Sequence, residues 1–195
     1  MMANEVLVNA GNVIPNGDWS ADLSTRGGFN FHVRSANPAD EAALAEFFTH
    51  VTPEDMRFRF LTALRQVDHD RLVAMTHVDH EKTENFLAFE PGASTIIATA
   101  MLAAEEALEK AEIAIAIRSD YKHRGISWTL LEHVACFAEA KGFKSIESIE
   151  SRDNHAAIEL EREMGFVALP CPGDPTLVIV RATLGQKQPA VPALG

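Results

Sequence analysis

One segment near the middle of the chain limits its possible folds more than any other. Residues 112–118 read Glu-Ile-Ala-Ile-Ala-Ile-Arg, so isoleucine and alanine alternate along them. Successive side chains of a strand point to opposite faces, which puts Ile113, Ile115 and Ile117 on one face and the alanines on the other. Because both faces are largely apolar, the segment predicts an inner strand of a sheet that helices cover on both sides.

Helical patterns precede this strand. Asn37 and Pro38 are a favoured N-cap and first helical residue, and Thr52 and Pro53 repeat the signal for a second helix. A third helix is expected around 69–76. Apolar residues at helical spacing predict the buried faces, with Leu44, Phe47, Phe48 and Val51 on the first helix and Phe58 and Leu61 on the second.

The second half of the chain continues the alternation of strands and helices. Two helices are expected, one from about residue 127 to Gly142 and one from Asn154 to Gly165, each ending at a glycine. Short strands are expected at 6–8, 29–34, 85–90, 95–102, 144–151, 166–169 and 176–183. This order predicts a mixed α/β sheet with a strand–loop–helix unit at its centre, where ligands are often held.

The length of the chain fits one domain. Its 195 residues can bury one sizeable core, and we expect an irregular leader over 1–28, a single domain over 29–184 and a tail over 185–195. No apolar run approaches the ~18 residues of a membrane span, and the N-terminus lacks a signal-peptide pattern. Two cysteines suggest no disulfide framework, so a cytoplasmic location is expected.

The charge of the chain restricts its partners. Seventeen basic and 28 acidic residues give a formal net charge of −11. This argues against non-specific binding of nucleic acid, which needs a basic surface, and it is compatible with a cationic acceptor such as an amine. A homodimer remains open beside a monomer.

Function is indicated by the loop that follows the alternating strand. Residues 122–127 read Lys-His-Arg-Gly-Ile-Ser and lead into the expected helix. The free backbone N–H groups of a helix N-terminus and the helix dipole favour an anion such as a pyrophosphate. Lys122, His123 and Arg124 add positive charge, and Gly125 permits close approach of the backbone. The alternative from these residues alone is a solvated basic loop at an ordinary helix start.

The loop resembles the acetyl-CoA loop of the GNAT acetyltransferase superfamily, with Lys122 where the pattern prefers Arg or Gln and Ser127 where it prefers Gly or Ala. A second match follows in the expected helix, at Asn154, Ala157, Ile158, Leu160, Met164, Gly165 and Phe166. The resemblance implies a GNAT fold, in which a mixed, mostly antiparallel sheet has helices on both faces and a splayed strand pair holds CoA. It implies that the donor substrate acetyl-CoA is bound by Ile115, Ile117, Lys122, His123, Arg124, Gly125, Ile126, Ser127 and Asn154.

A narrower resemblance extends over roughly residues 30 to 183. Residues 52–60, the region of Asp79, residues 111–112 and Asn154 are similar to the GNAT domain of bacterial Pat-type protein lysine acetyltransferases. The resemblance implies a protein lysine as the acceptor. It also implies that Glu112 is the general base that removes a proton from the attacking amine.

The residues themselves give Glu112 a reason to act as a base. A lysine-like amine is almost entirely protonated at neutral pH, so a positioned base is useful. Glu112 lies on an otherwise apolar strand, where partial burial would raise its pKa into a useful range. The alternative is a strand-end glutamate paired with a neighbour such as Lys110. Relatives place a tyrosine acid where this chain has Glu161, so no acid is assigned.

Two alternatives stay open at this point. The acceptor could be a small-molecule amine, or the domain could bind CoA as a regulatory module without turnover. A metal site is not expected, although His77 and His80 stand near ligand spacing, because no third ligand is arranged with them. Cys136 is expected in the core and Cys171 in a loop.

Overall fold

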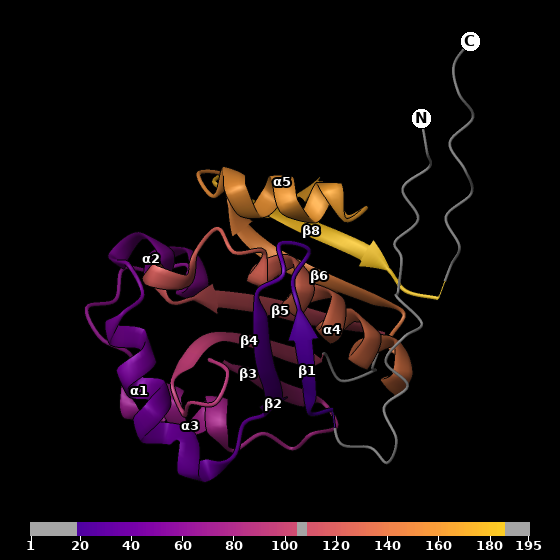
Figure 1. Ribbon diagram of the computed structural model, residues 1–195. Coiled ribbons are helices and arrows are strands. Elements are labelled where there is room, and N and C mark those ends of the chain that lie inside the picture. Colours follow the sequence, from indigo (N-terminus) through magenta and orange to yellow (C-terminus); the bar gives the residue numbers. More distant parts are fainter. Residues whose placement is uncertain (1–18, 105–108, 186–195) are drawn as a thin grey trace.

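A computed structural model of the protein describes residues 19–104 and 109–185, which build a sheet with helices on both of its faces (Figure 1). Eight strands of these residues form the sheet in the spatial order β1-β2-β3-β4-β5-β6-β8-β7. Only the neighbours β5 and β6 run parallel, and the other pairs are antiparallel. The strands are β1 Ala21–Ser24, β2 Asn30–Ser35, β3 Thr83–Phe89, β4 Ile96–Ala104, β5 Lys110–Ile117, β6 Ser145–Ser151, β7 Val167–Pro170 and β8 Leu177–Thr183.

The helices begin and end where their local signals place them. Thr52 accepts a hydrogen bond from the backbone of Asp55 and so caps its helix, and Asn37 caps the short 3₁₀ turn ahead of the first helix. Gly142, with a φ of 88°, ends the long helix as expected. The helices are α1 Glu41–Thr49, α2 Pro53–Phe60, α3 His69–Thr76, α4 Ile126–Lys141 and α5 His155–Glu163.

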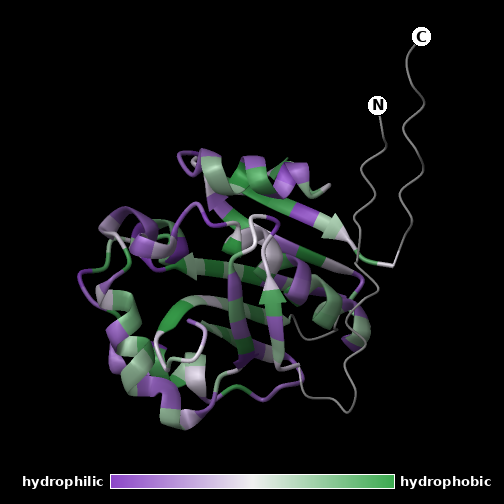
Figure 2. Cartoon of the chain, viewed as in Figure 1, coloured by the Kyte–Doolittle hydropathy of each residue, from purple (hydrophilic) through white to green (hydrophobic). Residues whose placement is uncertain are grey.

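Two apolar layers hold the helices against the sheet. One lies under α4 and α5 and contains Ile113, Ile146 and Phe137, while the other lies under α1 to α3 and contains Phe47 and Ala116. Figure 2 shows the central strands as largely hydrophobic and the helices as mixed. The mixed, mostly antiparallel sheet with helices on both faces is therefore confirmed.

Two details of the sequence prediction differ from the structure. A strand, β1, lies inside the expected irregular leader and pairs with β2, where antiparallel hydrogen bonding compensates for its weak local pattern. Leu61 does not extend the buried face of α2, because it adopts a left-handed conformation after the last turn and is 40% exposed. The strand expected at 6–8 lies outside the described residues, and the limits proposed for the domain remain a prediction.

The seam between β5 and β6 is the feature of the fold that matters most for the site. The two strands pair through only three registered positions, which end at Glu112 opposite Glu147. β5 continues to Ile117 and β6 to Ser151, yet no further pairs join them. The strands therefore splay apart toward their carboxyl ends, as expected.

Two kinds of feature were looked for in the described residues, a membrane-spanning helix and a metal-binding cluster. None of the helices within 19–104 and 109–185 combines the length and apolar character that a membrane span requires. Over the same ranges no three His, Cys, Asp or Glu side chains are grouped closely enough to hold a metal ion. His80 instead forms an ion pair with Glu84.

Candidate functional site

The splayed halves of β5 and β6 form a notch whose closed end we call the apex and whose open end we call the mouth. The apex lies at the last registered pair, Glu112 and Glu147. Because carboxyl ends of parallel strands meet at one edge of a sheet, the mouth lies where α4 follows β5 and α5 follows β6. Two helix N-termini therefore border the mouth.

The start of α4 is built to present backbone N–H groups. Gly125 is its N-cap, with a φ of 81°, and no side chain caps it. The first donor that reaches an acceptor inside the helix is Thr129, whose N–H lies 3.3 Å from the Gly125 carbonyl. The N–H groups of Ile126, Ser127 and Trp128 come before that point and have no acceptor within the helix. This is the arrangement that binds an anion.

Gly125 is required for a second reason besides its φ. A Cβ atom at this position would lie 3.2 Å from the Cβ of Thr25, in the turn between β1 and β2. The turn also brings the Arg26 guanidinium to 4.0 Å from the centre of the Trp128 ring. A pocket of about 400 Å³ opens here between α4 and α5, lined by both of these residues and by Leu160. Neither Arg26 nor Trp128 was expected in the site.

Lys122, which was expected to bind the donor, forms an ion pair within the protein. Its ammonium group lies 2.7 Å from both carboxylate oxygens of Asp55 on α2. Asp55 also accepts a hydrogen bond from the Thr52 hydroxyl. The charge of Lys122 is therefore neutralised within the protein, and the residue holds the loop against α2.

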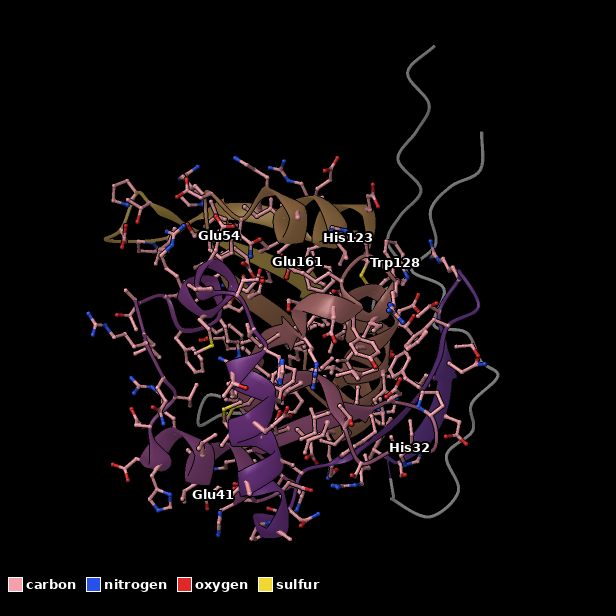
Figure 3. All side chains as sticks on the ribbon, turned by 60° about the vertical axis from the view of Figure 1, so that its left-hand side comes forward. His32, Glu41, Glu54, His123, Trp128 and Glu161 are labelled. Atoms are coloured by element: carbon pink, nitrogen blue, oxygen red, sulfur yellow. The ribbon has the colours of Figure 1, made fainter. Side chains whose placement is uncertain are left out.

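The next two loop residues are exposed. His123 has a φ of 62°, a left-handed conformation that is uncommon outside glycine. The Arg124 guanidinium lies over the rings of Phe29 and Tyr121, at 5.2 and 4.6 Å from their centres. Figure 3 labels His123 and Trp128 at this end of the molecule. Of the three basic residues expected here, His123 and Arg124 stay accessible to an anion.

Helix α2 lies across the mouth and contacts both of its sides. Lys122 joins it to the loop after β5, and the Arg57 guanidinium lies 3.7 Å from the carboxylate of Asp153, after β6. The Nε atom of Arg59, on the same helix, is buried and has no hydrogen-bond partner among the residues that the structure describes. Burial lowers the pKa of Arg59 to about 10, against the opposing charges of Glu112 and Glu150. Arg59 therefore lies close to two carboxyl groups of the notch.

Glu112 lies at the apex, on the face of the sheet that α1 to α3 cover. It shares this face with Ala116, which packs into the layer under those helices. The expected partial burial is wrong, because the carboxyl side chain is exposed. The Arg59 guanidinium is close enough to Glu112 for the two opposite charges to attract each other.

Asn154 and Glu150 form a pair on the β6 side of the mouth. The Asn154 amide donates a hydrogen bond of 2.7 Å to the Glu150 carboxylate. The Asn154 side chain stands at the N-cap position of α5 but makes no capping hydrogen bond. Burial raises the pKa of Glu150 to about 7, against the Asn154 hydrogen bond and the charge of Arg59.

Glu161 of α5 is the most unusual side chain of the notch. It is 6% exposed, and Figure 3 shows it on the inner side of α5. Burial, and next the charge of Glu150, raise its pKa to about 8, while the neighbouring Ser148 hydroxyl opposes the shift. Among the described residues, the buried side-chain atoms that have no hydrogen-bond partner are Arg59 Nε, His133 Nε2, Ser148 Oγ and Glu161 Oε2.

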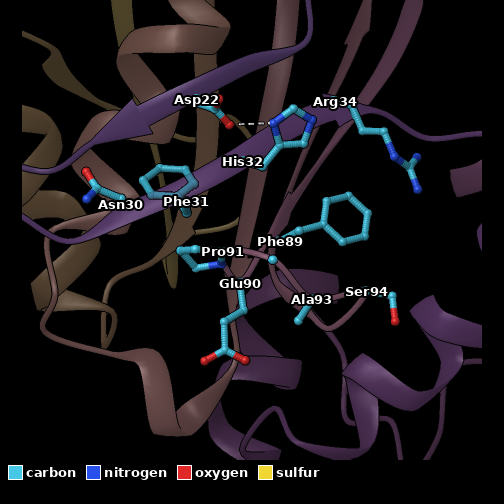
Figure 4. Close-up of a pocket in the computed structure, with 11 residues that line it drawn as sticks. Asp22, Asn30, Phe31, His32, Arg34, Phe89, Glu90, Pro91, Ala93 and Ser94 are labelled. Carbon is cyan, nitrogen blue, oxygen red and sulfur yellow. Dashed lines mark hydrogen bonds and ion pairs between the residues drawn. The ribbon is translucent and has the colours of Figure 1, made fainter.

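A larger cavity lies elsewhere, between β2 and the turn after β3 (Figure 4). It has a volume of about 650 Å³, and His32 in its wall contacts Ser20 at 3.1 Å and Asp22 at 2.8 Å. The Asp22 side chain is 92% exposed, so water weakens its interaction with His32. None of the residues that line this cavity belongs to the notch.

The structure brings most of the predicted site residues to one place. Glu112 lies at the apex, Ile115 and Ile117 line the splayed part of β5, and the loop 122–127 and Asn154 border the mouth. Sequence reasoning missed Arg59, Glu150 and the pocket residues Arg26 and Trp128. Glu150 could have been found from its position, because an acidic residue on an inward-facing side of a strand is costly without a partner.

The comparisons with known proteins agree on one family. The family model described as acetyltransferase (GNAT) family matches residues 44–166. Acetyltransferase PA5475 of Pseudomonas aeruginosa is 27% identical over 154 residues, which cover 78% of this chain and 83% of that protein.

Solved structures with the same fold include two that the chain covers almost completely. The GNAT domain of S. lividans PAT is 23% identical with a TM-score of 0.79, over 85% of this chain and 97% of that one. The structure of yncA from Salmonella typhimurium with its cofactor acetyl-CoA is 19% identical with a TM-score of 0.64, over 83% and 98%. At these identities the two structures show a shared fold.

Proposed function

The chain belongs to the GNAT acetyltransferase family, and on that premise we propose that it acetylates a protein lysine, with Glu112 as general base. Proteins of this family are acyl-CoA-dependent N-acyltransferases with acetyl-CoA as the donor substrate. The finer parts of the proposal are the acceptor, the base and the residues that bind the donor. The base and the donor-binding residues rest on the geometry of the notch, and the acceptor rests on similarity to known proteins and on charge.

The donor would bind along the splayed part of β5. The pyrophosphate meets the free N–H groups at the start of α4, beside Gly125 and the exposed Arg124. The pantetheine arm then follows the backbone of Ile117 and Ile115 toward the apex, and Asn154 faces it from the β6 side. The five residues 113–117 span about 16 Å at ~3.3 Å per residue, a length that suits an extended pantetheine arm.

The single observation that carries the reaction is the position of Glu112. It is the last residue of β5 that pairs with β6, so a thioester that reaches the apex lies beside it. Glu112 is accessible from the α2 side, where the amine would enter. Its carboxylate accepts a proton from the ammonium group, and the neutral amine nitrogen then attacks the thioester carbon.

A protein lysine is the preferred acceptor for two reasons. The fold neighbour from S. lividans and the resemblance of residues 52–60 to Pat-type domains support it. The net charge of −11 suits a cationic acceptor and steers it toward the protein. A small-molecule amine has the same nucleophile, so it forms the second arm of the test.

The proposal is tested by following thiol release from acetyl-CoA with a lysine-rich protein and with a panel of small primary amines. Glu112→Gln should lower kcat about 10²- to 10⁴-fold, because it removes the base, while acetyl-CoA binding measured by calorimetry stays unchanged. Glu81→Gln, an exposed substitution with the same loss of charge, is the control. Full turnover in Glu112→Gln would contradict the role of the base, and turnover on small amines alone would contradict the lysine acceptor.

A further inference from the structure

The proposed reaction leaves one developing charge without a partner. As the amine nitrogen attacks, the thioester carbon becomes tetrahedral and one electron pair of its C=O bond moves to oxygen. A hydrogen-bond donor aimed at this oxygen stabilises the charge, and loss of one such donor typically lowers kcat about 10²- to 10³-fold. With the thioester beside Glu112, the donor has to come from a group near the apex.

Arg59 of α2 extends over the strand that carries Glu112. Its Nη2 atom lies 3.7 Å from the sulfur of Met101 on β4. Met101 pairs with Ala114 of β5, which lies two residues beyond Glu112 and on the same face of the sheet. Because Met101 packs against the layer under α1 to α3, this is the face that α2 covers. The guanidinium therefore lies over the first splayed residues of β5, on the same side as the proposed base.

The guanidinium of Arg59 has donor capacity that the described residues leave unused. Its Nε atom is buried and has no hydrogen-bond partner within residues 19–104 and 109–185. The thioether sulfur that Nη2 contacts is only a weak acceptor. A buried donor without an acceptor is costly, and a bound molecule that supplies the acceptor removes this cost. Arg59 is thus placed to bind an oxygen atom of a substrate.

The charges around Arg59 decide which oxygen fits. Glu112 and Glu150 both attract the guanidinium, so two carboxyl groups already lie near it. A third carboxylate, from an acidic acyl chain or an acidic acceptor, would meet like charge there. A carbonyl oxygen is neutral when the donor binds and becomes negative only as the amine attacks, so a cation stabilises it most in the transition state. The thioester carbonyl is therefore the acceptor that suits Arg59.

From this geometry, and resting on the proposed function, we propose that Arg59 donates a hydrogen bond to the thioester oxygen of acetyl-CoA and stabilises the negative charge that develops there. Glu112 takes a proton from the ammonium group, and the amine nitrogen then bonds to the thioester carbon while a C=O electron pair moves to the oxygen beside Arg59. This pair re-forms the C=O bond as the C–S bond breaks and sulfur leaves with its electrons. The nitrogen gives its second proton to the thiolate, and Arg59 keeps all of its own protons.

The hydrogen bond is tested by the infrared carbonyl band of bound acetyl-CoA, recorded as the difference between donor with and without an isotope label at the thioester carbon. A hydrogen bond from a cation weakens the C=O bond, so the band of the wild-type complex should lie below that of free acetyl-CoA. Arg59→Met keeps an unbranched apolar side chain but has no donor, and its band should lie above the wild-type band. Arg65→Met, an exposed substitution with the same loss of charge, is the control and should give the wild-type band.

Thiol release measures the effect on the reaction. Arg59→Met should lower kcat about 10²- to 10³-fold, with the KM for acetyl-CoA changed less than about threefold, because the lost interaction strengthens in the transition state. Arg59→Lys should restore only part of kcat, since a single ammonium group replaces the fork of the guanidinium. Circular dichroism should show that the variants fold, and Arg59→Gln replaces Arg59→Met in both measurements if the methionine variant does not.

The outcomes separate this role from the proposed function. An unchanged carbonyl band in Arg59→Met would overturn the role even if kcat fell, because a loss of packing alone can lower kcat. A wild-type kcat in Arg59→Met would overturn it as well, and neither result contradicts the acetyl transfer. Wild-type protein that binds acetyl-CoA but acetylates no primary amine would overturn the proposed function, and the carbonyl band would still decide whether Arg59 contacts the thioester.

Discussion

The paired and the splayed halves of the β5–β6 seam differ in the partners that they provide for buried carboxyl groups. In the paired half, Glu147 is 4% exposed, but Lys110 lies 2.9 Å from one of its oxygens and Arg181 lies 2.6 Å from the other. Glu161 of α5, which faces Glu150 of the splayed half, is almost as buried, and its Oε2 atom has no hydrogen-bond partner within residues 19–104 and 109–185. Two cations therefore compensate Glu147 in the closed half, whereas Glu161 faces another carboxyl group, that of Glu150.

This difference separates structural from functional side chains. Removing one partner of a buried ion pair leaves an uncompensated charge, so such pairs tie their residues to the fold. A buried carboxyl group without a cation does little for stability and is retained more readily where a ligand uses it. Three substitutions test this difference between the two halves.

Glu147→Ala should destabilise the protein by about 3–5 kcal/mol, because Lys110 and Arg181 would both lose a buried partner. The free energy of unfolding from urea titrations measures the effect. Glu161→Ala is the matched control in the splayed half and should cost clearly less, since no cation loses its partner there. An equal loss of unfolding free energy in the two variants would contradict the difference between the two halves.

The stability difference between wild type and Glu161→Gln should depend on pH. The folded pKa of Glu161, about 8, lies above the unfolded value of about 4.3, so its stabilising contribution is complete below pH ~4.3 and is lost as the pH rises through about 8. Wild type should lose on the order of 2–4 kcal/mol relative to the variant between pH 5 and 9, at about 1.4 kcal/mol per pKa unit. Denaturation at both pH values measures this difference.

Glu147→Gln serves as the control for that comparison. The ion pairs of Glu147 stabilise the wild-type protein at pH 5 and at pH 9, so the variant should be the less stable protein at both. A constant difference between wild type and Glu161→Gln over this range would mean that Glu161 is not held neutral in the folded protein.

Gly125→Ala tests the mouth of the notch against Gly92→Ala, a glycine of similar positive φ in the turn after β3. Each variant should lose about 1–2 kcal/mol, because a side chain disfavours the left-handed conformation. Only at Gly125 would the new Cβ also meet Thr25, at 3.2 Å, whereas nothing lies within 4 Å of it at Gly92. The KM for acetyl-CoA should therefore rise in Gly125→Ala alone, and an equal rise in both would exclude the mouth as the donor site.

The parts of the fold that depend on local signals could be predicted from the sequence. The capped start at Thr52 and the terminal glycine Gly142 gave helix limits close to those found, and the alternation over 112–118 gave the inner strand. β1 could not be predicted, because Ala21–Ser24 has little strand character of its own and depends on pairing with β2.

The site was predictable to the extent that its residues follow one another along the chain. The loop 122–127 and Glu112 belong to a single strand–loop–helix unit, so their proximity follows from the sequence. The ion pair between Lys122 and Asp55 joins residues 67 positions apart, and the sequence contains no sign of it. The raised pKa of Glu161 likewise depends on packing between α5 and β6, which no pattern within α5 reveals.

The placement of α2 across the mouth has a further consequence. No backbone ladder joins the two strands there, so the opening is spanned by the Lys122–Asp55 and Arg57–Asp153 ion pairs, both of which water reaches in part. Partly exposed ion pairs weaken as dissolved ions screen them, whereas the hydrogen bonds of the closed seam do not respond in this way. Under the proposed function, the opening through which the substrates would enter is bridged by electrostatic attraction, so its width should respond to ionic strength while the rest of the sheet keeps its shape.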